Sequence, residues 1–295
     1  MIYTVTLNPA LDRSIGPEGE RIDPGGKGLN VAKTLNALGY KAIAVCFAAG
    51  KTGETLYRLA ANAQIELLPV PTPGETRVNL KLFDGETITE HNEPGPDFDL
   101  AAFEDLRMLL RERLQPGDTL ALCGSLPPKA PADCYAILAK DHPDCRVIID
   151  TSGPALAASI NAAPFCIKPN LAELEQLVGA SLPDLPSRIE VLRALLDRGL
   201  GTVLLSMGHE GAMLASHTGI RQAAAPKITV KGTVGAGDAM TAMLCAHPAD
   251  NCGELLRACV AAGSAACMQP GSVPPARSDW EALMDRVVSE LIAVF

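Results

Sequence analysis

Several short segments of the chain are apolar on both faces, and this feature constrains the fold most strongly. The runs Val147-Ile148-Ile149 and 203–205 lack the alternation of apolar and polar residues that a half-exposed strand shows. Such strands are typical of a parallel sheet whose two faces are both covered by helices. The sequence therefore predicts an α/β fold, in which ligands bind at the carboxyl ends of the strands.

Strand-like and helix-like segments alternate along the chain, as the connections of a parallel sheet require. We expect strands at residues 1–7, 42–48, 119–123, 146–150, 165–168 and 202–206. We expect helices at residues 29–38, 53–63, 131–139, 155–161, 171–178, 187–197, 239–246, 254–268 and 279–294. With 295 residues, 47% of them hydrophobic, the chain is long enough for one large domain over residues 1–295.

Residues 76–90 depart from this alternation and predict a β-hairpin. Asp84-Gly85 is a favoured hairpin turn between two runs of strand-forming residues. In the first run the apolar residues fall on one face and the polar residues on the other, the polar set being Arg77, Asn79 and Lys81. A solvated polar face is the ordinary interpretation of such a pattern.

The composition excludes several classes of protein. A net charge of −9 argues against nucleic acid or an anionic membrane as the main partner. The chain has no run of 18 apolar residues and no basic, apolar leader at its start, so we expect neither a membrane span nor a signal peptide. Nine cysteines without a C-x-x-C pair suit a reducing cytoplasm, and Cys245, Cys252, Cys259 and Cys267 are expected as small core residues.

The segment Gly235-Ala236-Gly237-Asp238 is the strongest functional signal. It joins a strand-like run at 228–230 to the helix expected at 239–246. Glycine leaves the backbone open to a ligand, and the first N–H groups of a helix have no partner within it. Such a junction can hold an anion, and Asp238 beside it could accept a proton. A glycine-rich turn whose Asp serves only the helix dipole is the alternative.

Three further groups of polar residues follow or precede expected elements. Gly25-Gly26-Lys27-Gly28-Leu29-Asn30 leads into a helix without matching a Walker A or dinucleotide motif, and Asp12 follows the first strand. Asn170 and Glu173 form either a capping box or a polar pair that positions Mg²⁺ through water. Residues 206–211 join two strand-like runs. The five histidines form no H-E-x-x-H motif, so a zinc hydrolase has no support.

In this order, these motifs resemble those of the phosphofructokinase B family of ribokinase-like carbohydrate kinases. The matching segments are residues 6–12, 25–31, 74–79, 124–127, 168–173, 206–211 and 233–238. The resemblance implies a three-layer sandwich, with a mainly parallel sheet covered by helices on both faces and a β lid. The lid elements would lie near residues 13–24 and 76–91.

The resemblance also implies a role for each matching residue. Asp238 would be the catalytic base, with Gly235, Ala236 and Gly237 as the anion hole. The sugar phosphate would be bound by Asp12, Gly25, Gly26, Lys27, Asn30, Arg77 and Ser125. ATP would be bound by Lys168, Asn170, Ser206, Gly208, Gly211 and Thr233, and its Mg²⁺ by Glu173.

The implied activity is ATP- and Mg²⁺-dependent phosphorylation of a ketohexose phosphate. Within the family, the residues are most similar to those of bacterial kinases of fructose 1-phosphate, followed by kinases of tagatose 6-phosphate; fructose 6-phosphate is a further alternative. Residues 13–24 are too few, and too rich in Gly and Pro, for the two lid strands of the family. We therefore expect a reduced lid and a doubtful homodimer, and we keep open a binding protein with little catalysis.

Overall fold

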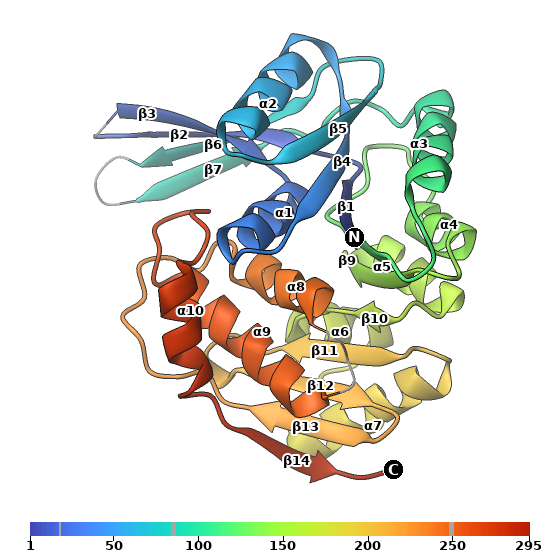
Figure 1. Ribbon diagram of the computed structural model, residues 1–295, viewed down its shortest axis with the longest axis vertical. Helices are drawn as coiled ribbons and strands as arrows, with labels where there is room; N and C mark the ends of the chain where they lie inside the picture. Colours follow the sequence, from blue (N-terminus) through green and yellow to red (C-terminus); the bar gives the residue numbers. More distant parts are fainter. Residues whose placement is uncertain (18, 84–86, 248–250) are drawn as a thin grey trace.

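The computed structural model describes residues 1–17, 19–83, 87–247 and 251–295 (Figure 1). The strands are β1 Ile2–Thr6, β2 Ala10–Gly16, β3 Gly19–Gly25, β4 Ala42–Ala48, β5 Glu66–Pro71, β6 Arg77–Phe83, β7 Ile88–Asn92, β8 Thr119–Cys123, β9 Arg146–Asp150, β10 Cys166–Ile167, β11 Thr202–Ser206, β12 Ala212–Ser216, β13 Gly219–Ala223 and β14 Ser289–Ala293. The α-helices are α1 Lys27–Ala37, α2 Gly50–Asn62, α3 Leu100–Arg113, α4 Cys134–Asp141, α5 Gly153–Ser159, α6 Leu171–Val178, α7 Leu185–Asp197, α8 Ala236–Ala246, α9 Cys252–Cys267 and α10 Arg277–Met284.

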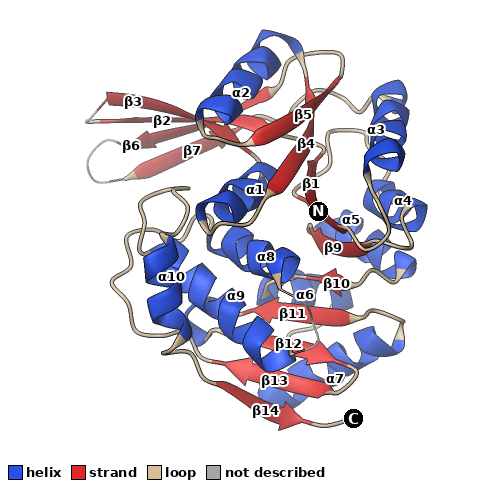
Figure 2. Cartoon of the chain, in the orientation of Figure 1, coloured by secondary structure: helices blue, strands red, loops and turns tan. Residues whose placement is uncertain are grey.

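The main sheet has ten strands in the order β14-β13-β12-β11-β10-β9-β8-β1-β4-β5. The strands from β11 to β5 in this order are parallel, and β12, β13 and β14 add an antiparallel edge. Helices cover both faces (Figure 2), which confirms the α/β sandwich expected from the doubly apolar strands.

Alternate residues of each central strand enter two separate cores. Leu120 and Leu122 of β8 pack with helices α3 to α7, whereas Ala121 and Cys123 pack with α1, α2, α8, α9 and α10. Successive side chains of a strand point to opposite faces, so a strand between two helical layers must be apolar throughout. This arrangement brings the carboxyl ends of β1, β8, β9, β10 and β11 to one edge of the sheet.

The lid is a second sheet of four strands in the order β3-β2-β6-β7, which projects from the sandwich (Figure 1). The expectation that residues 13–24 hold no strand pair was wrong. β2 starts at Ala10, directly after the core strand, and pairs with β3 from Ala10↔Gly25 to Gly16↔Gly19. Pro24 is tolerated because β3 is an edge strand. The argument against a homodimer rested on the short lid and therefore fails.

The predicted hairpin is present, as β6 and β7 pair antiparallel, although its Asp84-Gly85 turn lies outside the described residues. Two other expectations were wrong. The last helix ends at Met284, and Ser289–Ala293 instead forms β14, because the open edge of β13 supplies a pairing partner. Residues 228–230 form no strand and lie in an irregular segment beside a cavity.

None of the nine cysteines, all of which lie in the described residues, is joined in a disulfide. Cys245 and Cys259 are buried as expected, whereas Cys252 and Cys267 are only partly buried. Burial raises the pKa of the Cys245 thiol to about 12. Within the described parts of the chain, no helix combines the length and apolarity needed to cross a membrane.

Candidate active site

Charged side chains gather at the carboxyl edge of the main sheet, on the side of helix α8. Asp150 is the last residue of β9, and Lys168 follows β10 directly. Both are buried, with exposed fractions of 0% and 3%. Lys27, the first residue of α1, reaches the same place, where its Nζ lies 2.7 Å from Asp150 Oδ1. The topology therefore assembles one charge cluster from residues far apart in the sequence.

The N-terminus of α8 opens onto this cluster. Gly235 precedes the helix with a φ of 82°, a left-handed conformation that favours glycine. No side chain among the described residues caps this end, so its first N–H groups are available to an anion. The Lys168 ammonium lies 3.4 Å from the position that a Cβ on Gly237 would take. The predicted anion hole of Gly235, Ala236 and Gly237 thus faces a buried cation.

Asp238 lies in the first turn of α8, and 7% of it is exposed. Its Oδ2 accepts a hydrogen bond of 2.8 Å from Asn30 Nδ2, so helix α1 orients the carboxylate. Burial raises the pKa of Asp238, and Asp150 raises it further, against the opposing effect of Lys27. A helix N-terminus alone would make this aspartate a weak base. Burial makes it a stronger proton acceptor than its position on the helix predicts.

Asp150 is the main residue that the sequence reasoning missed. Its carboxylate accepts hydrogen bonds from Lys27 and, at 2.8 Å, from Thr241 Oγ1. It also forms an ion pair with Lys168 Nζ at 3.3 Å. Burial alone would raise the pKa of Asp150, but Lys168 and Lys27 outweigh it, so the pKa lies below its usual value. An aspartate directly after the apolar run Val147-Ile148-Ile149 was the available signal.

Asp12, which is predicted to bind the sugar, lies on the lid strand β2. Its Oδ1 accepts a 2.8 Å bond from Asn79 Nδ2 of β6. A Cβ on Gly25 would come within 2.5 Å of the Asp12 carboxylate, so this position requires glycine. Gly26 follows with a φ of 125° and leads into α1. Burial raises the pKa of Asp12, and the Asn79 bond only partly offsets it.

Ser125 and Arg77 lie near Asn8, at the end of β1. The Ser125 hydroxyl is 3.5 Å from Asn8 Nδ2. Arg77 donates from Nη2 to the Asn8 carbonyl at 3.1 Å and from Nη1 to the Glu93 carbonyl at 3.2 Å. These bonds use two of the five guanidinium N–H groups. Binding of a phosphate by Arg77 remains a prediction.

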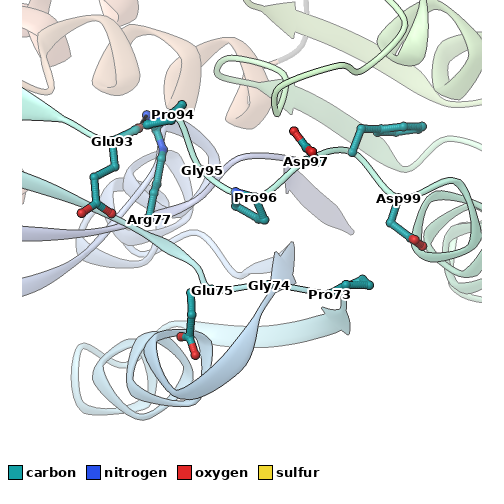
Figure 3. A pocket seen from close by; sticks show the side chains of 11 residues that line it. Pro73, Gly74, Glu75, Arg77, Glu93, Pro94, Gly95, Pro96, Asp97 and Asp99 are labelled. Atoms are coloured by element: carbon teal, nitrogen blue, oxygen red, sulfur yellow. Dashed lines mark hydrogen bonds between the residues drawn. The ribbon is translucent and has the colours of Figure 1, made fainter.

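Arg77 also lines a hollow of about 580 Å³ next to the lid. Figure 3 shows its side chain reaching the segment of Glu93, Pro94 and Gly95, with Glu75 and Gly74 on the opposite wall. The Glu75 carboxylate is bound at the start of α2, where it accepts a hydrogen bond of 2.6 Å from Thr52 Oγ1. The hollow therefore forms between the lid and the loop that Arg77 fixes.

A larger cavity of about 600 Å³ extends from the charge cluster over helices α8 and α9. Its lining includes the residues predicted to bind a nucleotide, namely Lys168, Asn170, Ser206, Gly208, Gly211 and Thr233, together with Lys27. Apolar residues, among them Val230, Met240 and Val260, also line it. A cavity lined by both charged and apolar residues suits a nucleotide, which carries charged phosphates and an apolar base.

Asn170 and Glu173 form a complete capping box at the start of α6. Asn170 Oδ1 accepts from Glu173 N at 2.8 Å, and Glu173 Oε2 accepts from Asn170 N at 2.9 Å. Both residues line the cavity, and Glu173 Oε1 stays outside the capping box. No group of three or more His, Cys, Asp or Glu side chains in the described ranges could hold a metal. A metal here would need ligands from phosphate and water.

Backbone N–H groups that can hold an anion, beside a buried carboxylate and two ammonium groups, are what the transfer of a phosphoryl group requires. The model of the pfkB family carbohydrate kinases matches residues 7–278, and the chain belongs to this family. It is 38% identical to the 1-phosphofructokinase of Rhodobacter capsulatus over 261 residues, 82% of each chain.

The chain is 33% identical to the 1-phosphofructokinase of Bacillus subtilis over 257 residues, which covers 82% of this chain and 84% of that protein. Among solved structures, it is similar to phosphofructokinase-2 from Escherichia coli in complex with fructose-6-phosphate. That similarity has a TM-score of 0.87 at 30% identity and covers 97% of this chain and 98% of the other. The family and the ribokinase-like fold inferred from the motifs are therefore confirmed.

Proposed function

We propose that the protein transfers the γ-phosphoryl group of ATP to fructose 1-phosphate and forms fructose 1,6-bisphosphate. The placement of Asp238 carries this proposal, because it directly follows Gly237, which lines the 600 Å³ cavity and faces the Lys168 ammonium. The choice of acceptor is supported by relatives named 1-phosphofructokinase.

The proposed step needs a base and a site for moving charge. The acceptor hydroxyl loses its proton to Asp238, its oxygen forms a bond to the γ-phosphorus, and the bond between that phosphorus and the β–γ bridging oxygen breaks to release ADP. The N–H groups at the start of α8, with Lys168, would stabilise the phosphoryl oxygens. Because the hydroxyl proton can leave late in such a loose transition state, correct placement matters more than basicity.

Mg²⁺ would accompany ATP in this site. Glu173 would hold it through its free carboxylate oxygen, mostly by way of water, since Mg²⁺ keeps much of its hydration shell. Bound there, the ion would neutralise charge on the nucleotide phosphates. The side chains of the protein supply the other functions. Asp12 would orient the sugar hydroxyls, and Asn30 would orient Asp238. The remaining residues assigned to the sugar and to ATP from the family motifs keep those roles in this proposal.

Fructose 6-phosphate is the second candidate acceptor, because the structurally similar phosphofructokinase-2 holds that sugar. Tagatose 6-phosphate is the third, on the family motifs alone. A binding protein with little catalysis was suggested by an incomplete lid, and the four-stranded lid removes that reason. The free thiols and the absence of a membrane-spanning helix in the described residues support a cytoplasmic location as part of the proposal.

A coupled ADP-release assay with Mg-ATP and each of the three sugar phosphates tests the proposal. We expect the highest kcat/KM with fructose 1-phosphate. A higher kcat/KM with fructose 6-phosphate or tagatose 6-phosphate would show that this other sugar phosphate is the acceptor, and the protein would still be a sugar-phosphate kinase. No ADP release with any of the three would contradict the kinase itself.

A further inference from the structure

The buried carboxylate of Asp150 joins elements from different parts of the site. Lys27 reaches it from helix α1, which carries Asn30, and Lys168 reaches it from the nucleotide side. Thr241, one turn after Asp238 on α8, donates to its second oxygen at 2.8 Å. One side chain therefore fixes three elements around the anion hole.

The burial of these groups shows why the carboxylate is needed. An ammonium group with 3% exposure, as Lys168 has, is costly to keep charged without a counter-ion. Lysine is also a flexible point charge whose direction depends on its partners. Asp150 supplies the counter-charge and the direction for both lysines, while Thr241 holds Asp150 through its hydroxyl, whose single proton also lies within reach of the Gly237 carbonyl, 3.1 Å from the hydroxyl oxygen.

We propose that Asp150 is a positioning residue that aims the Lys27 and Lys168 ammonium groups at the phosphoryl group in transfer. This inference rests on the phosphotransfer function proposed above. It adds a contact with the moving phosphoryl group to the sugar-phosphate role that the family motifs suggest for Lys27. Lys27 fits the new role because it lines the nucleotide cavity with Lys168 and acts electrostatically on Asp238.

The test compares Asp150→Asn with the wild type in kinetics and in nucleotide binding. We expect kcat/KM to fall about 100-fold, as when a preorganised donor to a transition state is lost. By calorimetry, the affinity for an ATP analogue with a β–γ imido bridge should fall about 10-fold or more relative to that for ADP, because only the analogue presents a γ-phosphoryl group. If Asp150 had a purely structural role, the variant would lose affinity for both nucleotides by the same factor.

The matched control is Asp118→Asn. Asp118 is also a buried carboxylate with an ammonium partner, the N-terminus of Met1, but it precedes β8 at the opposite edge of the sheet. This variant should keep wild-type kinetic constants and the wild-type ratio of analogue to ADP affinity. Equal losses in Asp118→Asn and Asp150→Asn would overturn the inference.

Should Asp150→Asn fail to fold, Thr241→Val and Thr241→Ser decide the matter. The valine variant loses the hydroxyl bond to Asp150, so kcat should fall about 10-fold, while the serine variant keeps the bond and the wild-type kcat. Wild-type values for Thr241→Val, or an unchanged ratio of nucleotide affinities in Asp150→Asn, would overturn the inference. Turnover by the wild type is measured first, so a failure of the proposed function is recognised separately.

Discussion

Asp12 in the lid and Asp150 in the main sheet are both carboxylates withdrawn from water, but their surroundings differ. Among the described residues, the Asp12 carboxylate accepts one side-chain hydrogen bond, from Asn79, and burial raises its pKa. Asp150 receives bonds or ion pairs from two ammonium groups and one hydroxyl, and its pKa is lowered in spite of burial. Asp12 is short of partners, whereas Asp150 is saturated with them.

This difference separates two tasks. A carboxylate with unused acceptor capacity can receive the hydroxyl groups of a sugar, which repay its desolvation only when the sugar is bound. A saturated carboxylate has no capacity for a ligand, but it can hold other groups in place. In the proposed reaction, the acceptor sugar would complete the lid side of the site, while the fold would preorganise the side where the phosphoryl group moves.

The largest effect is expected at Asp238, the proposed base. Asp238→Asn keeps the shape of the side chain but removes its capacity to accept the hydroxyl proton. We expect kcat to fall about 10³-fold or more, with both KM values changed much less. Initial-rate kinetics, with a melting curve to confirm folding, measure this. Near-normal turnover would remove Asp238 as the base.

The second prediction concerns stability and has opposite signs at the two carboxylates. Asp150→Asn leaves Lys168 buried without its counter-charge and should cost about 3–5 kcal/mol of unfolding free energy. Asp12→Asn removes a charge that burial disfavours, so it should leave the stability unchanged or raise it. Denaturant unfolding at neutral pH of both variants makes the comparison.

The signs follow from the pKa shifts. The lowered pKa of Asp150 means a stabilising contribution that is present above its unfolded pKa of about 3.9 and is lost as the pH falls through the folded value. The raised pKa of Asp12 means the reverse, a destabilising contribution at neutral pH that fades on acidification. A loss of stability in Asp12→Asn similar to that in Asp150→Asn would break the comparison.

The third prediction addresses recognition of the sugar. Asp12→Asn should raise KM for fructose 1-phosphate about 10- to 100-fold, because hydrogen bonds to a charged acceptor are lost, and leave KM for ATP unchanged. The matched control is Asp23→Asn, because Asp23 pairs across from Asp12 on β3 but is already bound to Arg21. If both variants shift KM equally, Asp12 has no special role.

The smallest effect concerns pH. Protonated Asp238 cannot accept a proton, so kcat/KM should decline on the acid side through a pKa above the usual value of about 3.9 for aspartate. Lys27→Gln removes an ammonium group that lowers the pKa of Asp238, so the acid limb of the pH–rate profile should move to higher pH. An acid limb that moves to lower pH would show that Lys27 does not act on the base.

Much of the sandwich could be predicted because its strands are apolar on both faces. The expected strands at residues 42–48, 119–123 and 202–206 match β4, β8 and β11 in full. The failures lie where tertiary pairing overrides local pattern. Residues 289–293 follow a helix in sequence, but the open edge of β13 recruits them as a strand.

The prediction for the lid was wrong for a different reason. The stretch between Asp12 and Gly25 is too short for two strands by itself, but β2 and β3 include both of these residues. Helix α3 and strand β5 were not predicted at all. At the site, the motifs predicted the anion hole at the start of α8 and the capping box of α6, and the structure confirms the capping box. Asp150 was not predicted, because one aspartate after a strand has no motif of its own.

Phosphorus NMR of the protein incubated with Mg-ATP and fructose 1-phosphate tests the central claim most directly, since it follows each phosphoryl group. We predict that the ATP signals decline while equal amounts of ADP and of a new phosphate ester on O6 of the sugar appear, and that Asp238→Asn forms neither at a comparable rate. ADP accompanied by inorganic phosphate, or the same rate of ester formation in Asp238→Asn, would contradict the account.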